Sequence, residues 1–219
     1  MSLGKHMADH AKLRVLTANN TGFLGTYTWA TRPSAATAGA GAEIRVSDVG
    51  PQYNRFVSDG TYWRPVGMVP LLTQLTEVTK TDADTATQTV FSYTVPAGLL
   101  TPGCALFGRF EFSANAVVAV AKNLAITLGG NGIGTYQMST TAMDYRGDFM
   151  IMAKDMASVK SYWPGNASLF GNAGGGAAYT QTARDLTTAL TLTATMAWAT
   201  AGTGANTLTF RPFKLWLIP

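Results

Sequence analysis

The two histidines of the chain, His6 and His10, lie in its first ten residues, so the sequence from Ala11 onward has no imidazole. Serine and cysteine nucleophiles usually act with a histidine base, and most zinc and iron sites use histidine ligands. Cys104 is the only cysteine, and its apolar neighbours are typical of a core residue rather than a nucleophile. We therefore predict no catalytic triad, no intrachain disulfide, no metal site and no cofactor.

Carboxylates are the catalytic groups that remain, and they are sparse. A glycosidase needs one carboxyl group as an acid and a second as a base or nucleophile. The candidates for such a pair are Asp82 with Asp84, Asp144 with Asp148, Asp155, Asp185 and Glu111. The run from Asp82 to Asp84 lacks the glycine and the distal glutamate of a calcium loop, which favours a solvated turn. A carboxylate-based glycan-degrading enzyme stays a remote alternative, and we expect the chain not to be an enzyme.

Two further pairs of residues are candidates for binding or assembly. Tyr162 and Trp163 precede a Pro-Gly turn, and aromatic rings placed in this way can stack on sugars, so the pair is a candidate glycan contact. Burial in a core or an interface is the alternative for both rings. Arg109 and Glu111 lie two apart on one face of a predicted strand, where they can pair with each other or across a subunit boundary.

The composition favours an assembled β protein. Only 13% of the residues are charged while 47% are hydrophobic, and the formal net charge of +4 is dispersed along the chain. Nucleic-acid binding requires clustered phosphate contacts, and a membrane helix requires about 20 consecutive apolar residues. Neither pattern is present, so we predict no nucleic-acid partner and no membrane insertion. A surface so poor in charge fits a chain that hides part of its outside in an oligomer.

Strand signals recur through the second half of the chain. From Leu186 to Trp198, apolar residues share one parity and threonines the other, which predicts a strand with one buried face. The last predicted strand, residues 207–218, is apolar on both parities. We expect its second face to pack against a neighbouring subunit. The predicted interface residues are Arg109, Glu111, Phe213, Leu215 and Leu217.

These signals predict an all-β chain in four parts. Residues 1–24 form a leader and an N-terminal arm, in which Met1 to His6 resemble a vector-derived leader. Residues 25–67 form a small β-ribbon module whose hairpin turns at Asp59-Gly60. Residues 68–87 form a linker strand, and residues 88–219 form an antiparallel jelly-roll or β-sandwich domain.

Two blocks of the sequence resemble a known class of phage proteins. The first runs from Arg32-Pro-Ser-Ala-Ala through Ile44-Arg-Val-Ser-Asp-Val-Gly50 to Val57-Ser-Asp-Gly-Thr-Tyr-Trp-Arg-Pro-Val-Gly67. It resembles a short module of phage fibre and head-decoration proteins. The second block, from Thr94-Val-Pro-Ala-Gly98 to Lys122-Asn-Leu-Ala-Ile-Thr-Leu-Gly-Gly130 and the apolar terminal strand, resembles the jelly-roll domain that often follows that module.

The resemblance implies a structural protein of a phage or prophage virion, made in the host cytoplasm. It further implies a homotrimer that contacts other virion proteins in a capsid or tail, with the N-terminal part toward the particle and the jelly roll outward. A fibre, spike or capsid-decoration unit of this kind can contribute to attachment through a host-surface glycan. A lectin-like carbohydrate-binding module that uses exposed aromatic residues is the alternative from a different class.

Overall fold

The computed structural model describes residues 22–115, 122–138, 143–162 and 180–219. These residues belong to two compact units. The first unit ends at Leu71 and includes Ile218 and Pro219, and the second comprises Leu72–Leu217. Trp163 and the glycine-rich run 171–176 lie outside the described residues.

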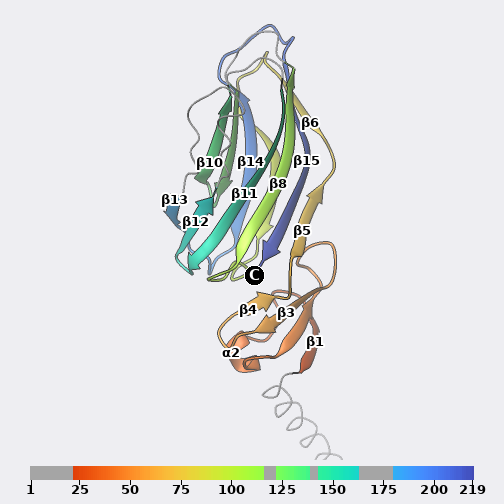
Figure 1. Ribbon diagram of the computed structural model, residues 1–219, viewed down its shortest axis with the longest axis vertical. Helices are drawn as coiled ribbons and strands as arrows, with labels where there is room; N and C mark the ends of the chain where they lie inside the picture. Colours follow the sequence, from red (N-terminus) through yellow and green to blue (C-terminus); the bar gives the residue numbers. More distant parts are fainter. Residues whose placement is uncertain (1–21, 116–121, 139–142, 163–179) are drawn as a thin grey trace, which may run out of the picture. The chain divides into compact units, whose positions relative to one another are not determined.

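The first unit is built on a four-stranded sheet in the order β1-β2-β3-β4 (Figure 1). Its elements are β1 (Phe23–Tyr27), α2 (Ala35–Ala38), β2 (Glu43–Val46), β3 (Asn54–Ser58) and β4 (Trp63–Pro65). The sequence predicts a β-ribbon here, but β1 pairs with β2 in parallel. A parallel pair needs a crossover connection, and α2 lies within it. The Oγ of Ser34 accepts a hydrogen bond from the Thr37 N–H at 3.0 Å and so caps this short helix.

Aromatic side chains make the core of the first unit. The rings of Trp29 and Phe56 lie 5.1 Å apart, and the indole N–H of Trp63 donates to the Pro33 carbonyl at 2.8 Å. The guanidinium of Arg32 stacks on Trp29 at 3.6 Å, and its burial lowers the pKa of Arg32 to about 10. The Asp59-Gly60 turn joins β3 to β4, with Gly60 at a φ of 95° that favours glycine.

The second unit is a β-sandwich of antiparallel strands, which confirms the predicted all-β jelly-roll class. One sheet has four strands in the order β10-β9-β14-β7, and the other has seven, ordered β13-β12-β11-β8-β15-β5 with β6 also paired to β15. The strands are β5 (Val69–Gln74), β6 (Val78–Thr81), β7 (Gln88–Val95), β8 (Ala105–Asn115), β9 (Lys122–Leu128), β10 (Asn131–Met138), β11 (Met143–Asp155), β12 (Ser158–Tyr162), β13 (Thr180–Ala183), β14 (Leu190–Trp198) and β15 (Thr207–Ile218). The segment assigned by the sequence to a linker strand therefore supplies two strands, β5 and β6, which both pair with β15.

The inner face of β15 packs into the centre of the sandwich. The ring of Phe213 lies 3.9 Å from Phe91 on β7 and 6.1 Å from Phe149 on β11. Phe210 lies 6.2 Å from Phe213 and 6.2 Å from Phe110 on β8. These contacts join both sheets through one strand. On β14, Leu192, Ala194, Met196 and Trp198 are buried, as the alternation of the sequence predicts.

Most apolar residues of β15 face the core, because the buried parity changes within the strand, and only Trp216 and Ile218 are partly exposed on the other side. Leu208 and Phe210 are buried on one parity, and Phe213, Leu215 and Leu217 on the other, with Arg211 exposed between them. Proline has no N–H to donate and commonly marks such irregular points, and Pro212 stands at the change. This finding corrects the expectation that Phe213, Leu215 and Leu217 face a neighbouring subunit: all three are already fully buried within the chain.

Replacement of Phe213 by alanine tests this inward position. A phenylalanine that contacts both sheets leaves a large cavity on truncation, so we expect Phe213→Ala to lower the free energy of unfolding by about 3–5 kcal/mol. The control is Lys214→Ala on the exposed face of the same strand, which should change that free energy by less than about 0.5 kcal/mol. Urea unfolding followed by tryptophan fluorescence measures both. If both variants changed the free energy of unfolding by equally small amounts, Phe213 would not be a core residue.

Candidate functional site

The carboxylates of the described residues serve as ion-pair partners or as acceptors in turns. The ion pairs are Glu43–Arg55, Asp59–Arg64, Asp84–Lys80, Asp148–Arg109, Glu111–Arg146, and the longer contacts of Arg211 with Glu77 and Asp144. The carboxylates that accept backbone N–H groups in turns and loops are Asp48, Asp82, Asp155 and Asp185. In the part of the chain that the structure describes, no three His, Cys, Asp or Glu residues come together as metal ligands would.

Asp82 is fully buried, which corrects the prediction of a solvated turn at this position. Its Oδ1 accepts the backbone N–H of Gly204 at 2.8 Å, and its Oδ2 accepts the side-chain amide of Asn206 at 2.5 Å. The Asp82 carbonyl also accepts the Gly202 N–H at 2.6 Å, and a Cβ on Gly202 would lie only 2.0 Å from Oδ2. The carboxylate therefore fixes the loop between β14 and β15. Asp84 is exposed, and its Oδ2 accepts from Lys80 Nζ at 3.0 Å.

Removal of the Asp82 carboxylate should destabilise the chain strongly. Asp82→Ala leaves the N–H donors of Gly204 and Asn206 unsatisfied at a buried position, so we expect a loss of about 3–5 kcal/mol in the free energy of unfolding. Asp144→Ala is the control, because it removes only a long, exposed contact with Arg211 at 3.9 Å, which is worth about 0–1 kcal/mol. Urea unfolding measures both variants. A loss from Asp82→Ala no larger than the control would contradict a structural role for this carboxylate.

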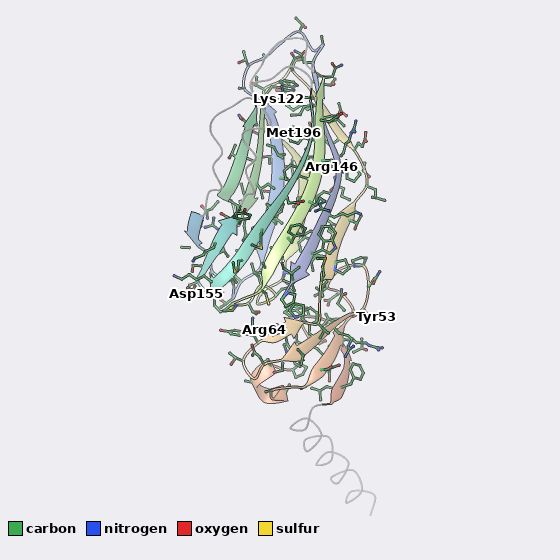
Figure 2. All side chains as sticks on the ribbon, viewed as in Figure 1. Tyr53, Arg64, Lys122, Arg146, Asp155 and Met196 are labelled. Carbon is green, nitrogen blue, oxygen red and sulfur yellow. The ribbon has the colours of Figure 1, made fainter. Side chains whose placement is uncertain are left out.

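Two buried residues with reactive groups lie in the sandwich core. Cys104 is 1% exposed, in keeping with its apolar sequence context. Lys122, at the start of β9, is fully buried, and its Nζ lies 5.5 Å from the centre of the Trp198 ring (Figure 2). Burial lowers the pKa of the Lys122 amine. The indole ring provides an electron-rich surface for this cation.

Charged side chains gather on the outside of the seven-stranded sheet, where β11, β8 and β15 run side by side (Figure 1). We call this surface the charged face and define it by Arg109, Glu111, Arg146, Asp148 and Lys214. These five residues line an open hollow of about 500 Å³. Its walls come from three strands, so only the folded sheet assembles it.

Two ion pairs cross from β8 to β11 on the charged face. Arg109 donates to Asp148 through two hydrogen bonds, Nε to Oδ1 at 2.8 Å and Nη2 to Oδ2 at 3.1 Å, and this contact raises the pKa of Arg109. Arg146, which is labelled in Figure 2, has its Nε 2.7 Å from Glu111 Oε1. The sequence leaves open whether Arg109 and Glu111 pair with each other or across subunits. Both instead pair with the residue directly opposite on β11.

Partly exposed aromatic rings adjoin the charged face. Phe107 on β8 and Trp216 on β15 have ring centres 5.7 Å apart, and the Arg109 guanidinium lies 5.9 Å from the Phe107 ring. Sequence reasoning missed this pair because the two residues are far apart in the chain and meet only across neighbouring strands. Of the predicted glycan contacts, Tyr162 ends β12 and is partly exposed, while Trp163 lies outside the described residues.

The outside of the four-stranded sheet of the sandwich, in contrast, carries no cluster of charged side chains. Across β7, β9, β10 and β14 the only charged residue is Lys122, which points into the core. We call this surface the threonine face. It is defined by the partly or fully exposed residues Thr89, Ser92, Thr94, Ala125, Thr127, Thr191, Thr193 and Thr195. Thr193 lies at its centre, opposite Ser92 on one side and Thr127 on the other, with the Thr127 and Thr193 hydroxyls 2.5 Å apart.

No protein-family model and no curated protein matches the sequence. Solved structures that resemble parts of the chain include dimeric latent PorU from Porphyromonas gingivalis, at 10% identity and a TM-score of 0.37 over 69% of this chain and 12% of that one. The CBM2 module of the evolved Dit of Lactobacillus casei BL23 phage J-1 is 8% identical with a TM-score of 0.32, over 57% of this chain and 67% of the module.

A third similar structure is that of T=1 particles derived from infectious bursal virus, at 14% identity and a TM-score of 0.34. The match covers 76% of this chain and 41% of that one, so the chain spans less than half the length of this protein and of PorU. Likenesses this distant assign no fold, activity, ligand or partner to the present chain. Within the described residues, no helix is long and apolar enough to cross a membrane.

Proposed function

We propose that the chain is a non-enzymatic structural protein of a phage or prophage virion and that it assembles as a homotrimer. In this proposal it is synthesised in the host cytoplasm and is incorporated into a capsid or tail as a fibre, spike or decoration unit. The observation that carries the proposal is the threonine face, a broad outer sheet surface that exposes no charged side chain.

The absence of charge gives this face the physical character of a subunit contact. The centres of protein interfaces are depleted of charged residues, because each buried charge loses its hydration. Short threonine, serine and alanine side chains have few rotamers to lose on burial, and their hydroxyls can satisfy one another, as those of Thr127 and Thr193 do at 2.5 Å. A sheet built to stay monomeric usually exposes charges on its outer surface. The charged face of the same unit follows that pattern, and the threonine face does not.

The roles of the carboxylates support the non-enzymatic part of the proposal. A glycosidase pair needs two carboxyl groups that face a common cleft. The candidate pair Asp144 and Asp148 is engaged with Arg211 and Arg109, and Asp82 is enclosed in its loop. Their partners fix loops and strand pairing, which is a structural use of acidic groups.

A charge placed in the middle of the threonine face tests the assembly. Sedimentation velocity at about 10–100 μM should show a trimer for the unaltered protein. The Thr193→Lys variant should be a monomer, because the lysine ammonium would have to lose its hydration at the subunit contact. The matched control is Thr209→Lys. Thr209 forms a similar cross-strand pair, with its hydroxyl 3.1 Å from that of Thr79, on the other sheet.

The control should remain trimeric, and circular dichroism should show that both variants stay folded. A monomer for the unaltered chain at these concentrations would overturn the trimer. Mass spectrometry of particles purified from a host that carries the gene tests the virion assignment, with immunogold labelling to distinguish capsid from tail. Absence of the chain from such particles would overturn the virion assignment even if the trimer held.

A further inference from the structure

We propose that the charged face binds an acidic polysaccharide, with uronic acid carboxylates on Lys214 and Arg109 and a sugar ring against Trp216 and Phe107. This inference adds a ligand to the structural role and goes beyond it. The ligand site and the proposed subunit contact lie on different sheets, so either can fail while the other holds.

The hollow carries more positive than negative charge. Three cations, Arg109, Arg146 and Lys214, line it together with two carboxylates, Glu111 and Asp148. Each carboxylate is paired with one arginine, at 2.7 and 2.8 Å. Within the described residues Lys214 forms none of these ion pairs, so its exposed ammonium is the charge in excess. An anionic ligand would give Lys214 the ion-pair partner that the two carboxylates of the hollow do not provide.

The ion pairs also hold the arginines in place for a ligand. The two hydrogen bonds from Nε and Nη2 of Arg109 to Asp148 fix the plane of the guanidinium. Nη1 of Arg109 makes no hydrogen bond among the described residues, and Arg109 lines the same hollow as Lys214. A side chain whose orientation is already fixed loses little entropy when it binds. Arg109 is therefore a pre-oriented donor for a carboxylate, and Lys214 adds a second cation in the same hollow.

The aromatic pair lies two residues from these cations along the same two strands. Phe107 precedes Arg109 by two residues on β8, and Trp216 follows Lys214 by two residues on β15. Two residues along a strand span about 7 Å, and side chains of the same parity share one face. Aromatic rings pack against the apolar face of a pyranose. The combination of rings with cations at this spacing favours an acidic sugar over a free inorganic anion, which needs no aromatic partner.

Isothermal titration calorimetry with defined trisaccharides tests the site on the full chain. The probes are trigalacturonic, trimannuronic and triguluronic acids, together with the neutral methyl ester of trigalacturonic acid. We expect at least one acid to bind with a Kd of about 0.1–1 mM, and binding to weaken as salt screens the charges. The ester should not bind. No binding by any of the three acids up to about 10 mM, or equal binding of the ester, would overturn the proposal.

Three variants locate the binding on the charged face. Lys214→Gln and Trp216→Leu should each weaken the active trisaccharide by about tenfold or more. Lys154→Gln is the matched control, because Lys154 is an exposed lysine of β11 outside the hollow, and it should leave the Kd within about twofold. Equal weakening by the control, or no weakening by Lys214→Gln or by Trp216→Leu, would overturn the site.

Sedimentation of Lys214→Gln distinguishes a ligand site from a contact between copies. The variant should keep the oligomeric state of the unaltered chain. Loss of oligomers on this substitution would identify the charged face as the subunit contact and overturn the polysaccharide proposal. Conversely, if the unaltered chain and Thr193→Lys are both monomeric and both still bind the trisaccharide, the trimer fails while the ligand site stands.

Discussion

The second unit of the chain depends on the packing of one strand, β15, between neighbours on its own sheet and against the opposite sheet. Phe213 contacts Phe91 across the sandwich and Phe149 within the seven-stranded sheet, and Phe210 extends the contact to Phe110. Interiors of this kind are close-packed, so a change in the size of this one ring would affect the packing of both sheets. The strands that carry the charged face, β8, β11 and β15, also contribute these inner rings, so the core holds the outer surface in register.

The two outer faces of the sandwich have different chemistry because each strand has two sides and the core uses only one. On β14, the buried Leu192, Ala194 and Met196 alternate with threonines that carry no charge. On β8, the buried Phe110 and Phe112 alternate with Arg109 and Glu111. Both sheets must bury apolar side chains on their inner faces. This requirement places no restriction on the chemistry of the outer residues, which can therefore differ between the sheets. In our proposals, one outer face serves assembly and the other serves a ligand.

The scarcity of histidine and of carboxylates takes on a more specific meaning in the folded chain. Several acidic residues are candidates for a catalytic pair when only the sequence is considered. In the folded chain these residues instead form ion pairs or accept hydrogen bonds in turns. Asp82 is the clearest example, because a carboxylate expected in a solvated turn is enclosed by the N–H groups of a loop more than 100 residues further along the chain. A buried, fully hydrogen-bonded carboxylate stabilises one loop conformation.

The sequence by itself determined the all-β class, the strand alternation of Leu190 to Trp198, the hairpin at Asp59-Gly60 and the core position of Cys104. These features are local, because side-chain parity and turn residues act over a few positions. Only the tertiary structure decided that β1 and β2 are parallel, that Asp82 is buried, and that Arg109 pairs with Asp148. It also decided that Phe213, Leu215 and Leu217 point inward, because the buried parity of β15 changes near Pro212. Such pairings join residues far apart in the chain, and cross-strand register is fixed by the whole sheet rather than by any one segment.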